Sequence, residues 1–137
     1  MTNTDKAEIW AALWQQHAPP DLAALPTRHA LQGGELLFAK DYNGRRWRFD
    51  WALPSPSVMV AVEIDGGKQM VRWSEKKRRY VVIGSHNSED DMERQNVAVV
   101  LGWRVLRFTP DMLRRDPLGC VQIVAEVVRR EMNKFAG

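Results

Sequence analysis

Three acidic residues lie at the ends of two segments that have the pattern of neighbouring β-strands. Asp50 belongs to RRWRFDWAL, while Glu63 and Asp65 end the apolar run VMVAVEID at 58–65. A carboxylate that is buried without a partner costs roughly several kcal/mol, so these acids need a cation. A hard divalent cation such as Mg²⁺ is one such partner. Bound with open positions for water and phosphate, it would support phosphodiester hydrolysis.

A second interpretation of the same acids is structural. Because side chains alternate along a strand, Glu63 and Asp65 share one face, and Asp50 shares a face with Arg46 and Arg48. Ion pairs between these arginines and Glu63 and Asp65 would neutralise the acids without a metal. The residues by themselves leave both interpretations open.

The first elements that must position the acids are a helix and a hairpin. Residues 5–17 carry apolar side chains at helical spacing, and a weaker helical stretch follows at 22–31. ELLFAK at 35–40, the turn signal at 41–44 and the segment 45–53 predict a β-hairpin. In its second strand, Trp47, Phe49 and Trp51 are expected on one face, opposite Asp50 and the two arginines.

The later elements complete a mixed sheet. Residues 58–65 predict a strand with Val58, Val60, Val62 and Ile64 on one face, and 103–108 predict a fourth strand. A helix is expected at 89–101, capped by Ser88 and ended by Gly102. The stretch 80–83 is a short strand or a helix end. The last helix starts at Pro117 and has a core stripe formed by Val121, Val124, Val128 and Met132.

This order, α-β-β-β-α-β-α, predicts an α/β fold with a mixed four-stranded sheet flanked by helices. The 137 residues fit one domain, and 45% hydrophobic residues are too many for a disordered chain. No apolar run is long enough for a membrane span and the start lacks a signal-peptide pattern, so a cytoplasmic location without membrane contact is expected. The single Cys120 excludes a disulfide framework and is expected to be an inert buried thiol.

Four segments in order resemble the PD-(D/E)XK nuclease superfamily: RRWRFDWAL, VAVEIDGGK, GSH followed by ERQN, and LGWRVLRFTP. The likeness is to its small phage and bacterial members related to very-short-patch-repair endonucleases. It implies a restriction-endonuclease-like catalytic core at 35–110 within a single domain, preceded by a helical segment at 1–34 and followed by a helix at 111–137. It also implies a DNA endonuclease that uses Mg²⁺, with Mn²⁺ as a substitute, in the cytoplasm, or in the host cytoplasm if phage-encoded.

The resemblance assigns roles by position. Asp50 matches the first metal-binding acid and Glu63 the second, while Asp65 occupies the slot where the superfamily usually has Lys and would complete or orient the metal shell. Lys68 and His86 are the candidates for proton transfer or phosphate contact. Glu35 resembles an acid found before the first strand.

DNA is the expected partner. The segment 72–79 interleaves Trp73 with five cations, which suits phosphate contacts and base stacking, although a solvated basic loop has the same composition. On the fourth strand Arg104 and Arg107 lie on opposite faces, and the likeness favours Arg107 toward the acids. The residues expected to contact DNA are Arg46, Arg48, Arg72, Lys76, Lys77, Arg78, Arg79 and Arg107. The other tryptophans (Trp10, Trp14, Trp47, Trp51 and Trp103) are expected in the core.

Two further functions stay open. One is a structure-specific nuclease of the Holliday-junction resolvase type, which would act as a homodimer so that two sites cut symmetric strands. The other is a nucleic-acid-binding protein that kept the nuclease fold without its chemistry. The missing Lys at position 65 is the feature that keeps the non-catalytic alternative open.

Overall fold

The computed structural model describes residues 3–32, 34, 36–55, 58–65, 70–83 and 89–134. Its centre is a four-stranded mixed sheet in the order β1-β2-β3-β6, in which β2 and β3 are antiparallel and β3 and β6 are parallel. The strands are β1 (Arg28–His29), β2 (Trp51–Ser55), β3 (Val58–Ile64) and β6 (Arg104–Phe108). The predicted α/β fold with a mixed four-stranded sheet is therefore confirmed.

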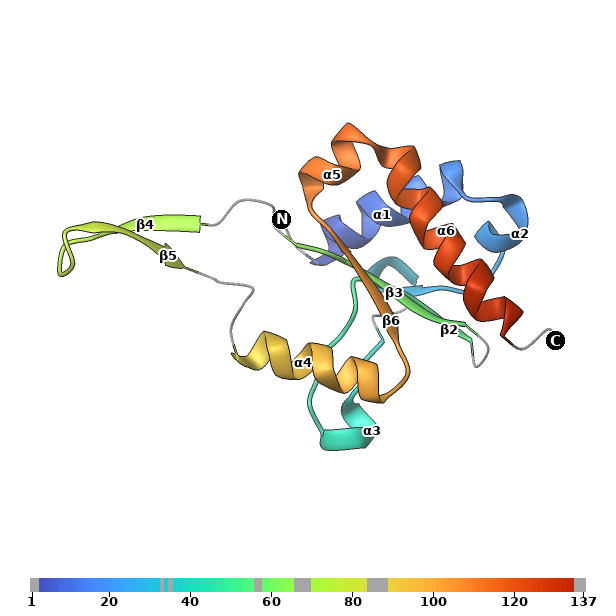
Figure 1. Cartoon of the computed structure of the whole chain (residues 1–137), viewed down its shortest axis with the longest axis horizontal. Helices are drawn as coiled ribbons and strands as arrows, with labels where there is room; N and C mark the ends of the chain where they lie inside the picture. The colour runs from blue at the N-terminus through green and yellow to red at the C-terminus, as the bar shows by residue number, and fades with distance from the viewer. Residues whose placement is uncertain are drawn as a thin grey trace.

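Helices cover both faces of this sheet (Figure 1). Helices α1 and α6 lie on one side, and the short α3 and the longer α4 lie on the other. The helical elements are α1 (Asn3–His17), α2 (Pro20–Ala23), the 3-10 turn η1 (Ala30–Gln32), α3 (Lys40–Asn43), α4 (Glu89–Val100), α5 (Pro110–Arg115) and α6 (Pro117–Asn133). Among the described residues, no helix is both long and apolar enough to cross a membrane.

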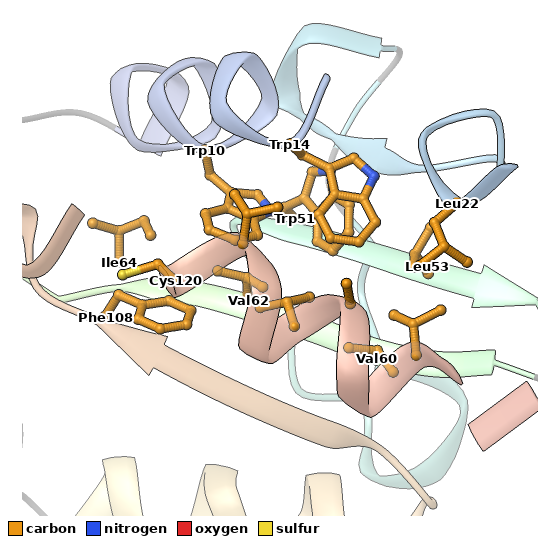
Figure 2. Close-up of a cluster of buried hydrophobic side chains, with 14 of the residues drawn as sticks. Trp10, Trp14, Leu22, Trp51, Leu53, Val60, Val62, Ile64, Phe108 and Cys120 are labelled. Atoms are coloured by element: carbon orange, nitrogen blue, oxygen red, sulfur yellow. The ribbon is translucent and has the colours of Figure 1, made fainter. Parts of the chain in front are cut away.

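The larger core fills the space between the sheet and helices α1 and α6. Figure 2 shows the indole rings of Trp10, Trp14 and Trp51 gathered between α1 and the sheet, and all three residues are buried. Trp10 also stacks on Phe108, with ring centroids 5.6 Å apart. The predicted alternation of β3 is confirmed, because Val58, Val60, Val62 and Ile64 all belong to this core. So is the apolar stripe of α6, formed by Val121, Val124 and Val128, with Met132 packed at its edge.

The opposite face of the sheet carries a smaller core. Ala52 and Ala61 are paired across β2 and β3, and both are buried against α4 through Ala98. Phe49 and Trp103 complete the cluster, with their rings 4.9 Å apart. Alanine side chains fill little space, so this side holds fewer apolar contacts and leaves room for charged side chains at the strand ends.

Local signals fix the helix ends. Helix α4 ends at Val100, one residue before the predicted end, and Gly102 then adopts a left-handed conformation (φ 91°) that turns the chain into β6. Thr109 caps α5 by accepting a hydrogen bond from the Met112 amide at 3.1 Å. Asp116 accepts one from the Gly119 amide at 3.0 Å, and Pro117 follows as the first residue of α6.

The predicted hairpin at 35–53 is wrong in its first strand. Only an isolated antiparallel bridge joins Leu37 to Arg48, and the short helix α3 takes the place of the tight turn. Gly44 follows α3 in the left-handed region (φ 78°), so the Asn-Gly pair ends a helical turn instead of forming a hairpin. The strand next to β2 at the edge of the sheet is instead β1, which lies within the stretch 22–31, where helix was predicted only in part.

The predicted side-chain alternation of the second strand is also wrong. The chain bends at Asp50 and β2 begins at Trp51. Phe49 therefore packs in the smaller core and Trp51 in the larger one, on opposite faces of the sheet. The bend breaks the period of two on which the sequence pattern depended.

A separate two-stranded hairpin is formed by β4 (Met70–Ser74) and β5 (Arg79–Ile83). Of the two structures left open for residues 80–83, the structure has the strand. The hairpin extends away from the four-stranded sheet (Figure 1).

We expect the replacement of a tryptophan by alanine to lower the free energy of unfolding much more in the core than on the hairpin. Trp51→Ala should lower the free energy of unfolding by about 3–5 kcal/mol, because it removes a fully buried indole. Trp73→Ala, on the exposed hairpin, should cost less than about 1 kcal/mol. Urea unfolding followed by circular dichroism measures both, and equal costs would contradict the assignment of the core.

Candidate functional site

The acids predicted from the sequence meet in one polar pocket beside the carboxyl ends of the parallel strands β3 and β6. The register places Glu63 directly opposite Arg107, so both belong to the same face of the sheet. The pocket has a volume of about 180 Å³ and is lined by four carboxylates, four cations and Ile64. These charged residues are Asp50, Glu63, Asp65, Asp91, Lys6, Arg48, Arg94 and Arg107.

Asp50 lies at the bend before β2 and is held against the next strand. Its Oδ2 accepts a hydrogen bond from the Ile64 amide at 2.7 Å. Burial raises the pKa of Asp50, while this hydrogen bond and the positive charges of Lys6 and Arg94 act in the opposite direction. Asp50 is thus a desolvated carboxyl whose ionised form would be favoured by a nearby cation.

Glu63 is the most deeply buried acid of the pocket, with 5% of its surface exposed. Arg94 of α4 pairs with it through both carboxylate oxygens, and its Nη1 lies 2.8 Å from Oε2. The Arg94 Nη2 also donates to the Arg48 carbonyl at 2.7 Å. Burial, and then the repulsion of Arg107, lower the pKa of Arg94 to about 10, so it remains charged at neutral pH.

Asp65 is held by Arg107 through two hydrogen bonds, at 2.7 Å from Nε and 3.2 Å from Nη2. This bidentate contact raises the pKa of Arg107. The same guanidinium lies 3.4 Å from an Asp91 oxygen and 3.9 Å from Glu63. Arg107 therefore connects three carboxylates, namely Glu63 of β3, Asp65 directly after β3 and Asp91 of α4.

The predicted directions of the two arginines on β6 are confirmed. Arg107 faces the acids, and Arg104 lies on the other face, where its Nη1 is 3.2 Å from Glu131 of α6. The structural interpretation, which pairs Glu63 and Asp65 with Arg46 and Arg48, names the wrong arginines. The partners of the two acids are Arg94 and Arg107, because α4 and β6 carry these guanidinium groups directly over the strand ends.

The remaining predicted site residues divide into three groups. Arg48 lines the pocket, whereas Arg46 is exposed and is not among the lining residues. Lys68, His86 and Glu35 lie outside the described residues. The other predicted cations belong to the β4-β5 hairpin, with Arg72 in β4. The four exposed cations at and after its turn do not line the pocket; they are Lys76, Lys77, Arg78 and Arg79.

Three pocket residues were missed by sequence reasoning, namely Lys6, Asp91 and Arg94. A signal for each exists in hindsight. Lys6 precedes the buried Trp10 by four residues, and Arg94 precedes the buried Ala98 by four, so each lies on the inward side of its helix. Asp91 is one turn before Arg94 on the same face.

The metal assignment stays a prediction. Within the described ranges, no three His, Cys, Asp or Glu side chains are grouped as a metal site. The physical reason is that Arg94 engages Glu63 and Arg107 engages Asp65, so the predicted ligands Asp50, Glu63 and Asp65 each have a separate partner.

Comparisons with family models, with curated proteins and with solved structures found no match for this chain.

The buried ion pair predicts a large asymmetry between two arginines. Arg94→Met would remove both hydrogen-bonding contacts of the buried Glu63 and leave it, among the described residues, only the Arg107 guanidinium at 3.9 Å, so it should lower the free energy of unfolding by about 3–5 kcal/mol. Arg130→Met breaks an exposed pair with Glu126 and should cost about 0–1 kcal/mol. Adding Glu63→Gln to Arg94→Met should recover much of the loss. Denaturant unfolding tests this, and a cost below that of Arg130→Met would contradict it.

The raised pKa of Asp50 predicts a pH-dependent gain from Asp50→Asn. Asn keeps an acceptor for the Ile64 amide but cannot ionise. Because folding favours the protonated carboxyl, the native chain loses stability as the pH rises from about 3.8 through the raised pKa. The variant should match the native chain near pH 3.5 and melt at a higher temperature at pH 7, with the difference growing as the pH rises through the raised pKa. Melting curves from pH 3.5 to 8 measure this, and a pH-independent difference would rule it out.

Proposed function

We propose that this chain is a metal-dependent DNA endonuclease with a restriction-endonuclease-like core. The observation that carries the proposal is the meeting of Asp50 and Glu63, from the bend before β2 and from β3, in one polar pocket. These are the two acids that the resemblance to PD-(D/E)XK nucleases assigns to the metal. The order of an antiparallel pair, a helix and a parallel strand, β2-β3-α4-β6, also agrees with that resemblance.

The donor chemistry of the pocket fits Mg²⁺ or Mn²⁺. Carboxylate oxygens are hard ligands, and the burial that raises the pKa of Asp50 would be offset by a bound cation. Asp50 and Glu63 would hold the ion, which when bound supplies a Lewis acid and lowers the pKa of a water molecule. Both oxygens of Asp65 accept hydrogen bonds from Arg107, so Asp65 would act by orienting that arginine.

Arg94 would exchange its carboxylate partner for another group during catalysis. Arg94 competes with a cation for Glu63, so metal binding requires it to release the carboxylate. A guanidinium is planar and presents paired donors, which suit a phosphate as well as a carboxylate. Arg94 and Arg107 would thus bind the DNA phosphate at the pocket where the acids hold the cation.

Proton transfer has three candidates. Lys68 and His86 come from the resemblance, and Lys6 is the ammonium group that the structure adds to the pocket. A neutral His can accept a proton near pH 7, whereas a Lys needs a strongly lowered pKa to do so. Lys6 and Lys68 are therefore better suited to phosphate contact and His86 to proton transfer.

One observation favours a second function, a DNA-binding protein without catalysis. The ion pairs of Arg94 with Glu63 and of Arg107 with Asp65 already neutralise two of the acids. An acid pair that is satisfied by arginines needs no metal, and position 65 lacks the Lys that the superfamily usually has.

Cleavage of supercoiled plasmid with Mg²⁺ or with EDTA tests the proposal. The native chain should nick or linearise the plasmid only with the cation, and Asp50→Asn and Glu63→Gln should reduce cleavage below detection. The matched control is Asp41→Asn, because Asp41 is an exposed acid on α3 and should not affect the rate. Cleavage that survives in Asp50→Asn would rule out the assigned site.

A thermal shift assay separates the two functions without relying on cleavage. A cation bound at a hundred times its Kd should stabilise the native chain by about 2.7 kcal/mol and leave Asp50→Asn unshifted. DNA binding with neither a shift nor cleavage would favour the non-catalytic function.

A further inference from the structure

The β4-β5 hairpin is built as an arm. It extends away from the four-stranded sheet in Figure 1, and within the described part of the chain its two strands make extensive contact only with each other. Its turn is held locally, because Ser74 accepts hydrogen bonds from the Arg78 amide at 2.7 Å and the Lys77 amide at 3.2 Å. The described residues of the arm are therefore held by each other, without extensive packing of β4 or β5 on the described core.

The arm also holds the basic charge of the protein. Residues 70–83 contain five cations and one acid, a net charge of +4, while the whole chain has a net charge of +3. The rest of the chain is thus slightly acidic, at −1. A polyanion would be attracted to the arm, whereas two arms with the same charge would repel each other.

Two aromatic side chains are exposed on one face of the arm. The register places Trp73 directly opposite Tyr80, and they are 45% and 70% exposed. Their rings meet edge to face, with centroids 5.2 Å apart and planes at 75°. In this edge-to-face geometry, each ring covers at most one face of the other. Trp73 is also the one exposed tryptophan of the six.

We propose that the arm binds DNA at unpaired bases, with Trp73 and Tyr80 stacking on the bases and Lys76, Lys77, Arg78 and Arg79 contacting the adjoining phosphates. This inference rests on the proposed function for its partner, DNA. In an intact duplex the faces of the bases are covered by their neighbours, and only their edges are accessible in the grooves. Cations alone would suffice for a duplex, so the exposed aromatic pair points to strands whose bases are unstacked.

The proposal implies a substrate preference. Single strands, bubbles and junctions with open bases should bind more tightly than a blunt duplex of the same length. The arm would then direct the candidate site toward DNA that contains an unpaired segment.

Fluorescence anisotropy with labelled DNA in EDTA tests this without any metal. The probes are a single strand, a blunt duplex and a duplex with a central unpaired bubble. Trp73→Ala with Tyr80→Ala should weaken binding of the single strand and the bubble by about 10-fold or more, the scale of losing one or two stacked bases. Binding of the blunt duplex should change by less than about two-fold, since its bases offer no face for stacking.

Matched variants separate stacking from charge and from folding. Tyr42→Ala removes an aromatic side chain that is 55% exposed on α3 and should leave all three affinities unchanged. Trp73→Phe with Tyr80→Phe should retain most of the binding. Lys76→Gln with Lys77→Gln should weaken all three probes and reduce the slope of log K against log salt by about 0.7–0.9 for each phosphate that the variant no longer neutralises.

Several outcomes would overturn the inference. These are unchanged bubble affinity in the double alanine variant, an equal loss on the blunt duplex, or a dimer in sedimentation that this variant dissociates, which would make the arm an interface between two copies. Failure of the proposed nuclease is a different result. Selective binding of unpaired DNA in EDTA, together with no cleavage by the native chain in Mg²⁺, would support the arm and reject the endonuclease.

Discussion

The buried ion pair between Glu63 and Arg94 is the interaction on which the charged pocket beside α4 depends. Glu63 is buried near the carboxyl end of β3, where its carboxylate cannot remain charged without a cation, and Arg94 of α4 supplies that cation. The same guanidinium donates to the Arg48 carbonyl and lies over the rings of Phe38 and Phe49, at 5.7 and 6.0 Å from their centroids. The Arg94 side chain thus joins α4, the end of β3 and the segment before β2. Joining that segment to β3 brings Asp50 and Glu63 into one pocket.

The two faces of the sheet differ in what holds them together. On the α1 and α6 side, three tryptophans and the valines of β3 and α6 form a large apolar core, although the indole N–H groups of Trp10 and Trp14 have no hydrogen-bond partner among the described residues. On the α4 side, small residues form a smaller apolar core, and ion pairs between opposite charges also hold the elements together. Because carboxylates and cations are equal in number in the pocket, a cation and a phosphate could enter together with little change in its total charge.

Strong periodicity was enough to predict much of the fold. Local sequence patterns predicted the alternation of β3 and the apolar stripe of α6, and they predicted the bounds of α4 and β6 to within one residue. The edge strand β1 and the helix α3 were missed because the signals there have two meanings. Asn43-Gly44 suits a hairpin turn and a helix end equally, and a bend at Asp50 hides a change of face within an alternating pattern. In the site, Asp50, Glu63 and Asp65 were found from their strands, and Arg107 from the family resemblance. The spacing of Lys6 and Arg94 places each on the inward side of its helix, but which groups they meet depends on how the helices pack on the sheet.

The charge distribution separates how DNA would be attracted from how it would be cut. With the arm removed from the count, the chain carries a net charge of −1, so the body of the protein has little long-range attraction for a polyanion. In physiological salt, screening limits such attraction to about 8–10 Å, so the cations that act are those that project toward the ligand. Under the proposed function the arm would set the encounter and the form of DNA that binds. The pocket, whose carboxylates and cations are equal in number, would then contribute only short-range contacts to one phosphate. It would recognise the phosphate group itself, and Trp73 and Tyr80 would select the form of DNA that binds.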